Sequence, residues 1–372
     1  MLLRRGDEGT AVAEVRATLA ALGLLGNSVA DDAARFDAST ELAIRHFQQR
    51  RGLSADGVVG AETYAALTAA RWRLGDRVLG FHPAAAMVGD DVMALQVQLL
   101  EMGYDVARPD GVFGARTDAQ LRSFQHDRGL VPDGVCGPVT LRALRQLGRR
   151  VVGGRPQLLR ELAAFSAAGP NLSGKRIVVN PGHGGADPGH QWGDVCEANL
   201  TWDLATRLEG RLAAVGVTSW LTRGPDSGPS DEQRAEFAND IGADLMLSLH
   251  VDGAPSPRAE GLACYYYGGG HDSASTIGER FADLIQREVV ARTGMLDDRV
   301  HGKTWGILRL TRMPAVQVEV GYLTSPADRA RLADPSFRDA VAEGLLVAVQ
   351  RLYLAKADDP PTGVMRIPAI VG

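Results

Sequence analysis

The chain has 372 residues, of which 45% are apolar and 23% are charged, and its formal net charge is −5. This composition excludes a mini-protein, a disordered chain and a coiled coil, and at roughly 100–200 residues per domain it predicts two or three domains. The 45 acidic residues outnumber the 40 basic ones, so general binding of nucleic acids is not expected. The three cysteines, Cys136, Cys196 and Cys264, are too scattered for a disulfide framework and are predicted to be free, buried thiols.

The N-terminus begins MLLRRGDEGTAV, where Arg4 and Arg5 directly follow the first leucines. A secretory signal needs an apolar core of about 7–15 residues, which this stretch lacks. No later segment reaches the roughly 18 apolar residues of a transmembrane span. The sequence as written therefore predicts a cytoplasmic protein. An extracytoplasmic location is expected only if the N-terminus is incomplete or an unrecognised export route exists.

An internal repeat occupies residues 1–72 and 77–148, with twelve identities at an offset of 77 positions. The identical residues are Phe36, Thr40, Phe47, Gln48, Gly52, Leu53, Asp56, Gly57, Val58, Gly60, Thr63 and Leu67 in the first copy, and Phe113, Thr117, Phe124, Gln125, Gly129, Leu130, Asp133, Gly134, Val135, Gly137, Thr140 and Leu144 in the second. Apolar residues recur at helical spacing, as at Val12, Val15 and Leu19. Each copy is therefore predicted to be a small helical bundle.

Two Asp-Gly pairs, at 56–57 and 133–134, mark predicted turns between the second and third helices, where glycine allows a positive φ. The repeated pattern resembles the three-helix peptidoglycan-binding domain of bacterial wall hydrolases, over nearly all of both copies. Binding of wall polymer is implied by this resemblance alone, since most of the repeated residues suit cores and turns. The first copy has Arg16 where the second has Gln96 at the family's usual Gln, which favours the second copy if only one binds.

Residues 149–173 hold glycines and prolines around one amphipathic stretch, PQLLRELAAF, and are predicted to be a linker with one or two helical turns. Beyond it, apolar runs alternate with amphipathic helices, which predicts an α/β domain over 174–355 with a mostly parallel, twisted sheet covered on both faces. The predicted strands are KRIVVNPGHGG, GVTSWLTR, ADLMLSLHVD, LACYYYG and AVQVEVGYL, and the predicted helices lie near 197–214, 230–241, 272–293 and 335–355. The whole chain is thus predicted to be two small all-α three-helix domains followed by an α/β domain.

Polar side chains follow the predicted strands where such sheets bind ligands, at the carboxyl ends. His183 comes directly after IVVNPG, His250 closes DLMLSLH, Glu319 lies within AVQVEVG, and Glu197 opens the helix after the first strand. Two imidazoles and a carboxylate are a common ligand set for catalytic zinc, which retains a water and lowers its pKa to about 7. A second carboxylate can then serve as general base. Spacing alone leaves the alternative that these histidines are structural.

Ordered motifs extend this pattern along the domain: VVNPGHGGADPG, CEANLTWDLA, LTR, Arg234 with AND, LSLHVDGA and GILRLTRMPAVQVEVGYLTSP. Together they resemble the zinc-dependent N-acetylmuramoyl-L-alanine amidases of the Amidase_3 type, over essentially all of residues 175–354. The resemblance implies hydrolysis of the amide bond between the lactyl group of muramic acid and the L-alanine of peptidoglycan stem peptides.

The same resemblance assigns a role to each candidate residue. It implies that His183, Glu197 and His250 are the Zn²⁺ ligands. Glu319 becomes the general base, which takes a proton from the attacking water and gives one to the leaving amine. Arg309 corresponds to a family arginine that orients the substrate or the base, with an ordinary ion pair as the alternative.

Three positions depart from the family pattern, with Asp252 in place of Asn, Tyr322 in place of Phe and Thr324 in place of Asn. None of these changes removes a proposed ligand or the base. Asp252 adds a negative charge beside the metal, which is expected to strengthen metal binding or to change how the substrate is received.

Other residues with ligand chemistry have simpler interpretations. Asp187 suits a turn, and His190 and His301 are expected to be solvated loop histidines. Cys196 precedes a proposed ligand, but a buried thiol is the favoured interpretation.

Two hypotheses about function follow. The first is a zinc amidase acting on peptidoglycan or muropeptide fragments. The second, motivated by the missing signal and by a resemblance to signal-less amidase homologues of mycobacteria, is a catalytically silent regulator that binds a wall-precursor enzyme or a lipid-linked precursor. The segment 356–372 is predicted to be a flexible tail, with Thr362 a candidate for phosphorylation. The sequence does not predict the oligomeric state.

Overall fold

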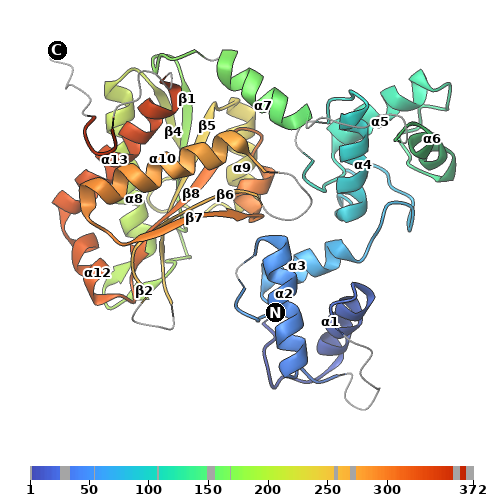
Figure 1. The fold of residues 1–372 in the computed structure, drawn as a ribbon, viewed down its shortest axis with the longest axis horizontal. Coiled ribbons are helices and arrows are strands. Elements are labelled where there is room, and N and C mark those ends of the chain that lie inside the picture. Colours follow the sequence, from blue (N-terminus) through green and yellow to red (C-terminus); the bar gives the residue numbers. More distant parts are fainter. Residues whose placement is uncertain are drawn as a thin grey trace. The chain divides into compact units, whose positions relative to one another are not determined.

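The computed structural model describes residues 2–25, 34–53, 55–106, 109–148, 156–167, 169–254, 259–268, 274–354 and 361–365. The chain divides into two compact units, Met1–Leu159 and Arg160–Gly372, and each is described by itself (Figure 1). The first unit is helical, and the second contains a sheet with helices on both sides. The predicted fold class is confirmed.

The first unit contains the two repeats, each with three helices and a core of its own. The helices are α1 (Thr10–Ala21), α2 (Ala38–Arg51) and α3 (Ala61–Ala70) in the first repeat, and α4 (Asp90–Glu101), α5 (Ala115–Asp127) and α6 (Pro138–Gly148) in the second. Phe36 and Phe47 are buried in the first core, and the equivalent Phe113 and Phe124 are buried in the second. Short antiparallel bridges, such as the one between Leu3 and Val59, tie the connecting segments together.

A buried glutamine on one helix holds the loop that leads to the next helix. Gln48 Nε2 donates to Asp56 Oδ1 at 2.7 Å, to the carbonyl oxygen of Val58 at 2.9 Å and to Thr63 Oγ1 at 3.1 Å. Gln48 Oε1 in turn accepts from the backbone N–H of Gly57, whose φ is 79°. The Asp-Gly turn therefore depends on the glutamine as well as on the glycine.

The same arrangement recurs in the second repeat, at Gln125 with Asp133 and at Gln96 with Asp110. In the first repeat Arg16 takes the place of Gln96, and its Nη1 donates to Asp37 Oδ1 at 3.0 Å. Gln96 is 1% exposed and Arg16 is 8% exposed, so both side chains bind their own loops. The interpretation that this difference marks the second repeat as the binder is therefore not supported, because the family's glutamine has a structural role.

Substituting Gln48 by alanine is expected to destabilise the first repeat by about 2–3 kcal/mol, because buried donors and acceptors of the loop lose their partner. Gln49, its neighbour on α2, is exposed, so Gln49→Ala is the matched control and is expected to change stability by less than about 0.5 kcal/mol. Hydrogen exchange of the amides of α2 and α3 in the full chain measures both changes. Equal protection of these amides from exchange in the two variants would refute the structural role of Gln48.

The second unit is built around a six-stranded sheet with the order β4-β1-β5-β8-β6-β7. Its strands are β1 (Arg176–Pro181), β4 (Thr218–Leu221), β5 (Leu245–Asp252), β6 (Leu262–Tyr267), β7 (Asp297–Lys303) and β8 (Ala315–Tyr322). Strands β4, β1, β5 and β8 are parallel, and β6 is antiparallel to β8. Two further short strands, β2 (Gln191–Trp192) and β3 (Val195–Cys196), form a hairpin.

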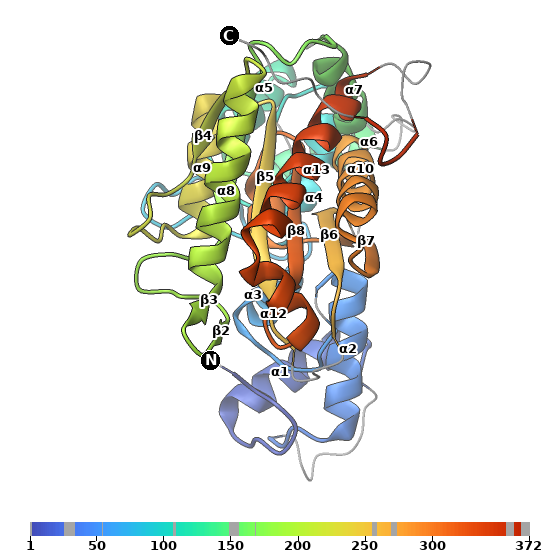
Figure 2. The ribbon, with the colours of Figure 1, turned by 90° about the vertical axis from the view of Figure 1, so that its left-hand side faces the viewer.

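Helices cover both faces of this sheet (Figure 2). They are α8 (Glu197–Ala214), α9 (Asp231–Ile241), α10 (Thr276–Thr293), α11 (Gly306–Leu310), α12 (Pro326–Ala333) and α13 (Pro335–Tyr353). Alternate strand residues, such as Leu247 and Val318, belong to the core formed with α8, α10 and α13. Residues of the opposite face, such as Val178 and Met246, pack with residues of α9 and α11. Because side chains alternate along a strand, His250 and Glu319 lie on the second face.

Several elements differ from the prediction. The helix α7 (Pro156–Ala167) has 12 residues where one or two turns were predicted, and Phe165 stacks on Tyr353 with ring centroids 4.8 Å apart. Strand β7 was not predicted, because its polar sequence DDRVHGK suits an exposed edge strand and shows no apolar alternation. Cys136 and Cys264 are free and buried as predicted, whereas Cys196 is partly exposed.

Part of the predicted flexible tail contacts the helices. Arg292 Nη2 donates to the carbonyl oxygen of Met365 at 2.5 Å, and the N–H of Gly363 donates to Glu288 Oε1 at 3.3 Å. Thr362 Oγ1 accepts from Arg351 Nη1 at 3.4 Å, and its phosphorylation stays a prediction. The segment 361–365 is thus held against α10 and α13, while 355–360 and 366–372 lie outside the described residues.

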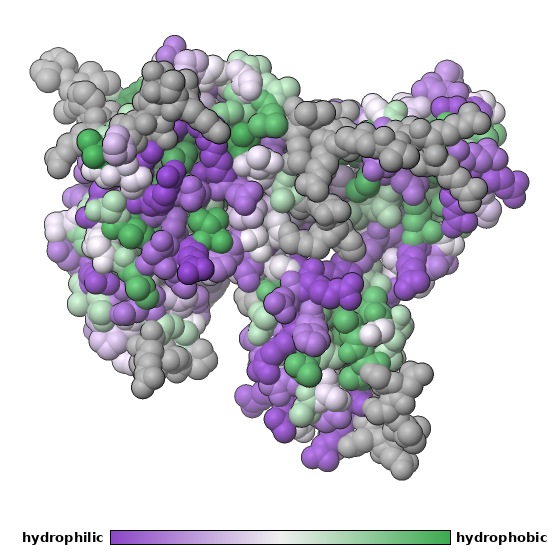
Figure 3. Space-filling model, viewed as in Figure 1, coloured by the Kyte–Doolittle hydropathy of each residue, from purple (hydrophilic) through white to green (hydrophobic). Residues whose placement is uncertain are grey.

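On the face that Figure 3 shows, hydrophilic side chains occupy much of the surface, and apolar ones form small patches between them. Among the exposed apolar side chains are Val131 and Val139 of the second repeat and Trp192 of the hairpin. Within the described ranges, no helix has both the length and the apolar character needed to cross a membrane.

Candidate metal centre

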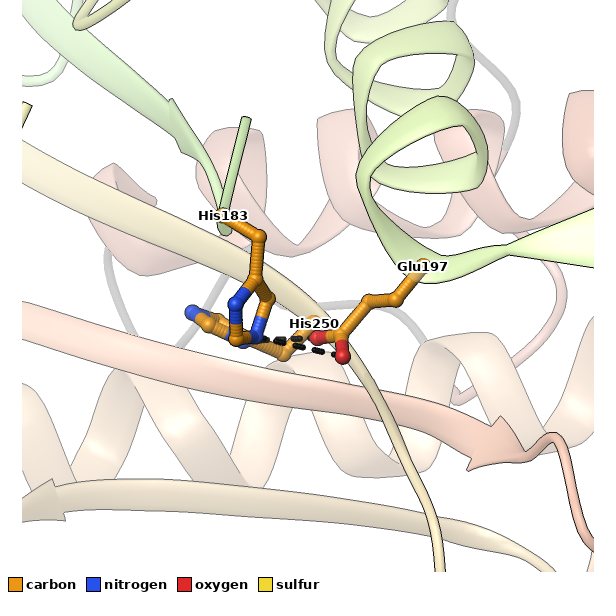
Figure 4. A group of neighbouring side chains, drawn as sticks. All are labelled: His183, Glu197 and His250. Atoms are coloured by element: carbon orange, nitrogen blue, oxygen red, sulfur yellow. Dashed lines mark hydrogen bonds and ion pairs between the residues drawn. The ribbon is translucent and has the colours of Figure 1, made fainter. Parts of the chain in front are cut away.

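Three segments bring two histidines and a glutamate together in the second unit (Figure 4). His183 follows β1, Glu197 is the first residue of α8, and His250 lies on β5. One ligand atom from each of these residues lies within 4.8 Å of the others. The residues predicted as a ligand set span 67 positions of the chain, from His183 to His250, so only the fold brings them together.

The carboxylate of Glu197 contacts both imidazole rings, one with each oxygen. Its Oε1 is 2.8 Å from His250 Nδ1, and its Oε2 is 3.2 Å from His183 Nε2. The Glu197 side chain is 1% exposed, whereas those of His183 and His250 are 26% and 18% exposed. The group is therefore buried at the carboxylate and open to solvent at the imidazoles.

Close packing of the backbone makes this convergence possible. His183 adopts a left-handed conformation with φ 55°, which costs a non-glycine residue about 1 kcal/mol. A Cβ on Gly182 would lie 2.4 Å from His250 Cε1, and one on Gly189 would lie 2.5 Å from Glu197 Oε2. Glycine is therefore required at both positions, because the ligand side chains occupy the space that another residue would fill.

Asp187 orients the first histidine. Its Oδ2 lies 2.7 Å from His183 Nδ1, so a proton on Nδ1 leaves the lone pair of Nε2 directed at the centre. Its Oδ1 also accepts from the N–H of Gly189 at 3.1 Å. Asp187 therefore orients His183 in addition to its predicted role in a turn. The four-residue spacing between His183 and Asp187 was the only sequence signal for this orienting contact.

Substituting Asp187 by alanine is expected to weaken zinc binding about tenfold. Residues that hydrogen-bond to a metal ligand typically contribute about 10–100-fold to metal affinity, and the lower end is expected here because the Asp187 side chain is 66% exposed. Asp226→Ala, at another exposed acidic residue of this unit, is the control and should leave the affinity unchanged. Titration of the apo-protein against a chromophoric zinc chelator measures both. A tenfold loss in the Asp226 variant as well would mean that general charge, and not orientation, is responsible.

His183, Glu197 and His250 shift one another's pKa values. Burial alone would raise the pKa of Glu197, but hydrogen bonds from His183 and His250 hold it well below its usual range. Burial would lower the pKa of His183, but Glu197 and Asp187 outweigh it and raise the pKa to about 9. The pKa of His250 is raised in the same way, against its burial, by Glu197 and Glu319. The carboxylates thus stabilise positive charge at this position, which is what a cation site requires.

Glu319 occupies the neighbouring strand, beside the histidine of β5. Strands β5 and β8 pair with Glu319 opposite His250, which places both side chains on the same face. Glu319 is 7% exposed, and its Oε1 accepts from Gln317 Nε2 at 2.9 Å. Burial raises its pKa to about 7, and the charges of Asp252 and Glu197 add to this shift while that of His250 opposes it. A carboxyl group of this kind can both accept and donate a proton near neutral pH.

The donor set fits zinc. Two imidazole nitrogens and one carboxylate oxygen converge, an outer carboxylate orients one imidazole, and the imidazole side is open. Catalytic zinc sites use three protein ligands of these types and keep one open position. Cys196, which directly precedes Glu197, is not part of the group of side chains close enough to share a metal.

The other candidates lie outside this group. His190 Nε2 is 3.7 Å from Asp252 Oδ1, and His301 Nε2 is 2.7 Å from the carbonyl oxygen of Asp298. The hydroxyl of Tyr322 donates to Asp298 Oδ2 at 3.3 Å. The substituted position Thr324 instead accepts, through Oγ1, from the backbone N–H of Ala254 at 3.1 Å. None of these side chains contributes to the convergent ligand set.

Arg309 lies on α11. A hydrogen bond from Ser230 and the charge of Arg309 lower the pKa of Glu232 on α9. The role implied for Arg309, orientation of the substrate or of the base, stays a prediction.

Two family descriptions match the chain. Residues 177–351 match the family described as N-acetylmuramoyl-L-alanine amidase. Residues 8–67 and 88–144 match the putative peptidoglycan binding domain.

Individual relatives agree with these matches. N-acetylmuramoyl-L-alanine amidase CwlM of Mycobacterium tuberculosis is 50% identical over 374 aligned positions, which cover 97% of this chain and 92% of the relative. The germination-specific N-acetylmuramoyl-L-alanine amidase of Bacillus subtilis is 29% identical and covers 51% of this chain and 84% of its own length. Among solved structures, the catalytic domain of CwlV, an amidase from Bacillus (Paenibacillus) polymyxa var. colistinus, has 27% identity and a TM-score of 0.44, covering 47% of this chain and 96% of that chain. The chain belongs to the N-acetylmuramoyl-L-alanine amidase family.

Proposed function

We propose that the protein is a zinc-dependent hydrolase of the amide bond between the lactyl group of muramic acid and the L-alanine of peptidoglycan stem peptides. The observation that carries this proposal is the convergence of His183, Glu197 and His250 within 4.8 Å, with Glu319 opposite His250 on the next strand. Family membership supports the bond that is cleaved, and the donor set supports the metal.

Hydrolysis of an amide requires two proton transfers and stabilisation of the charge that develops on the carbonyl oxygen. A zinc ion held by His183, Glu197 and His250 would supply the Lewis acid that polarises the carbonyl group. Glu319 takes a proton from the attacking water and gives one to the departing nitrogen of L-alanine. Its pKa of about 7 suits both transfers, because neither protonation state is strongly favoured at neutral pH.

The repeats of the first unit are proposed to hold peptidoglycan near the amidase domain. The match of both repeats to the putative peptidoglycan binding domain supports this role. Their buried glutamines and phenylalanines serve the bundles themselves, so a polymer must contact other, exposed side chains.

The test is to incubate the zinc-loaded full chain with a muropeptide and to identify the products by mass spectrometry. The proposal predicts a stem peptide with a free L-alanine amino group and a muramic acid with a free lactyl carboxylate. Cleavage within the peptide or of an acetamide group would show another reaction class. Absence of any product from protein with bound zinc would overturn the proposed hydrolysis and would favour the alternative hypothesis of a catalytically silent regulator.

A further inference from the structure

Two buried arginines lie beside the metal centre and take no part in the proposed chemistry. Arg223, at the end of the LTR motif after β4, is 5% exposed, and Arg234 on α9 is 4% exposed. In the described part of the chain, all their hydrogen bonds go to carbonyl, hydroxyl or amide oxygens. Burial lowers the pKa of Arg223 to about 10, so its guanidinium group remains charged at neutral pH.

Arg223 joins the backbone segments that carry two of the ligands. Its Nη2 donates to the carbonyl oxygen of Gly182 at 3.0 Å, one residue before His183, and to that of Ala198 at 2.8 Å, one residue after Glu197. Thr201 Oγ1 donates to the same Gly182 oxygen at 3.0 Å. One guanidinium group and one hydroxyl group therefore fix the spacing between the His183 segment and the start of α8.

The same peptide group also connects to the third ligand. The N–H of Gly182 donates to the carbonyl oxygen of Leu249 at 2.9 Å, one residue before His250. The backbone of Gly182 thus links the segments that carry all three ligands, and Arg223 holds its carbonyl side.

Among the three segments that carry ligands, Arg234 donates only to the one that carries His183. Its Nη2 donates to the carbonyl oxygen of His183 at 2.7 Å, and its Nη1 donates to that of Pro181 at 2.7 Å and to Asn180 Oδ1 at 2.6 Å. These contacts hold the left-handed residue His183 and the residues that precede it. They supply the fixed environment that an unfavourable backbone conformation needs in order to persist.

Burial of two guanidinium groups without a hydrogen-bonded carboxylate is costly. A well-packed apolar side chain at such a position would often give a protein of equal or greater stability. The rigid fork of donors distinguishes arginine from such replacements, because it can bind several carbonyl groups in a fixed geometry. The value of these arginines therefore lies in the geometry of the segments that they hold.

We propose that Arg223 and Arg234 are positioning residues that set the affinity and geometry of the metal centre by fixing the backbone beside its ligands. This inference rests on the proposed zinc site. Arg223 couples His183 to Glu197, whereas Arg234 holds His183 alone, so the effect of Arg223 is the larger one.

The experiment compares zinc affinity with folding for Arg223→Lys and Arg234→Lys in the full chain. Zinc dissociation constants are measured by competition with a chromophoric chelator, and the stability of the apo-protein is measured by thermal unfolding. The expected loss of affinity is about 100-fold for Arg223→Lys and about tenfold for Arg234→Lys, the range found for outer-sphere partners. The absorption spectrum of bound Co²⁺ should also change, since lysine cannot hold two carbonyl groups in the same geometry.

Arg351→Lys is the matched control, because Arg351 is 2% exposed and pairs with Glu288 on helices that carry no ligand. It should lower the unfolding temperature while zinc affinity and the Co²⁺ spectrum stay unchanged. If Arg223→Lys does not fold, Thr201→Val removes one of the two donors to the Gly182 oxygen with little change in volume and should weaken zinc binding about tenfold.

Folded arginine variants, or a folded Thr201 variant, that bind zinc as tightly as the unmodified protein would overturn the positioning role and leave the proposed function intact. Failure of the unmodified protein to bind zinc would instead overturn both the metal site and this inference.

Discussion

Replacing Glu319 by glutamine is expected to lower kcat for muropeptide hydrolysis by a factor of about 10²–10⁴, the usual contribution of a general acid–base group. Glutamine keeps the shape of the side chain but can neither accept the proton of the attacking water nor return it to the leaving nitrogen. Zinc affinity should change little, because Glu319 is not one of the three residues whose ligand atoms converge. The measurement is kcat of the zinc-loaded variant, with its metal content determined in the same sample.

Glu288→Gln provides the comparison for this variant, since Glu288 is fully buried but pairs with Arg351 away from the metal centre. Loss of this pair should lower the unfolding temperature. At a temperature where the variant is folded, its kcat should stay within about twofold of that of the unmodified protein. If Glu319→Gln retained full activity with zinc bound, Glu319 would not be the base.

Replacing Glu197 by glutamine is expected to weaken zinc binding by more than the 10–100-fold that is typical of outer partners, because a charged ligand atom is lost. Glu197 is the buried centre of the group, bonded to His250 Nδ1 at 2.8 Å and accepting from the N–H of Val251 at 3.1 Å. Removal of its charge leaves the two imidazoles without the group that stabilises a cation between them. Isothermal titration of the apo-protein with zinc measures the loss.

Glu209→Gln, on the same helix α8, is the control and should bind zinc like the unmodified protein. In the Glu197 variant, the rate of hydrolysis should decrease in proportion to the loss of bound zinc. Removal of zinc from the unmodified protein by a chelator should have the same effect. Unchanged zinc affinity in Glu197→Gln would show that the metal binds elsewhere.

The main features of the centre follow from sequence because they depend on local rules. His183 and His250 lie at the carboxyl ends of apolar strands, where α/β sheets bind ligands. Glu319 is a carboxylate within a run of valines, a costly position unless the group has a partner or a chemical role. The three ligands could be named together only because ordered motifs identified the family, since their separation in the chain carries no distance information.

The contacts that support the centre were not predicted. Asp187 occupies an ordinary turn sequence, and only the fold shows that its carboxylate also meets His183 Nδ1. Arg223 and Arg234 were noted as parts of motifs, but their targets are backbone carbonyl groups, which every residue carries and no sequence pattern marks.

The fold shows the same division between local and long-range information. Helices with apolar spacing and parallel strands with apolar runs were predicted, whereas the polar edge strand β7 was not. In the repeats, Arg16 of the first copy occupies the position of Gln96 in the second. Arg16 binds Asp37, whereas Gln96 binds Asp110, and these partners could not be identified from the sequence.

The most direct test of the proposed hydrolysis is to run the reaction of zinc-loaded protein with a muropeptide in water enriched in oxygen-18. The proposed function predicts one labelled oxygen in the lactyl carboxylate of muramic acid and none in the released stem peptide, with no reaction after zinc is removed and recovery when it is restored. A labelled peptide carboxylate, a labelled acetate, or no labelled product from protein with His183, Glu197 and His250 loaded with zinc would contradict it.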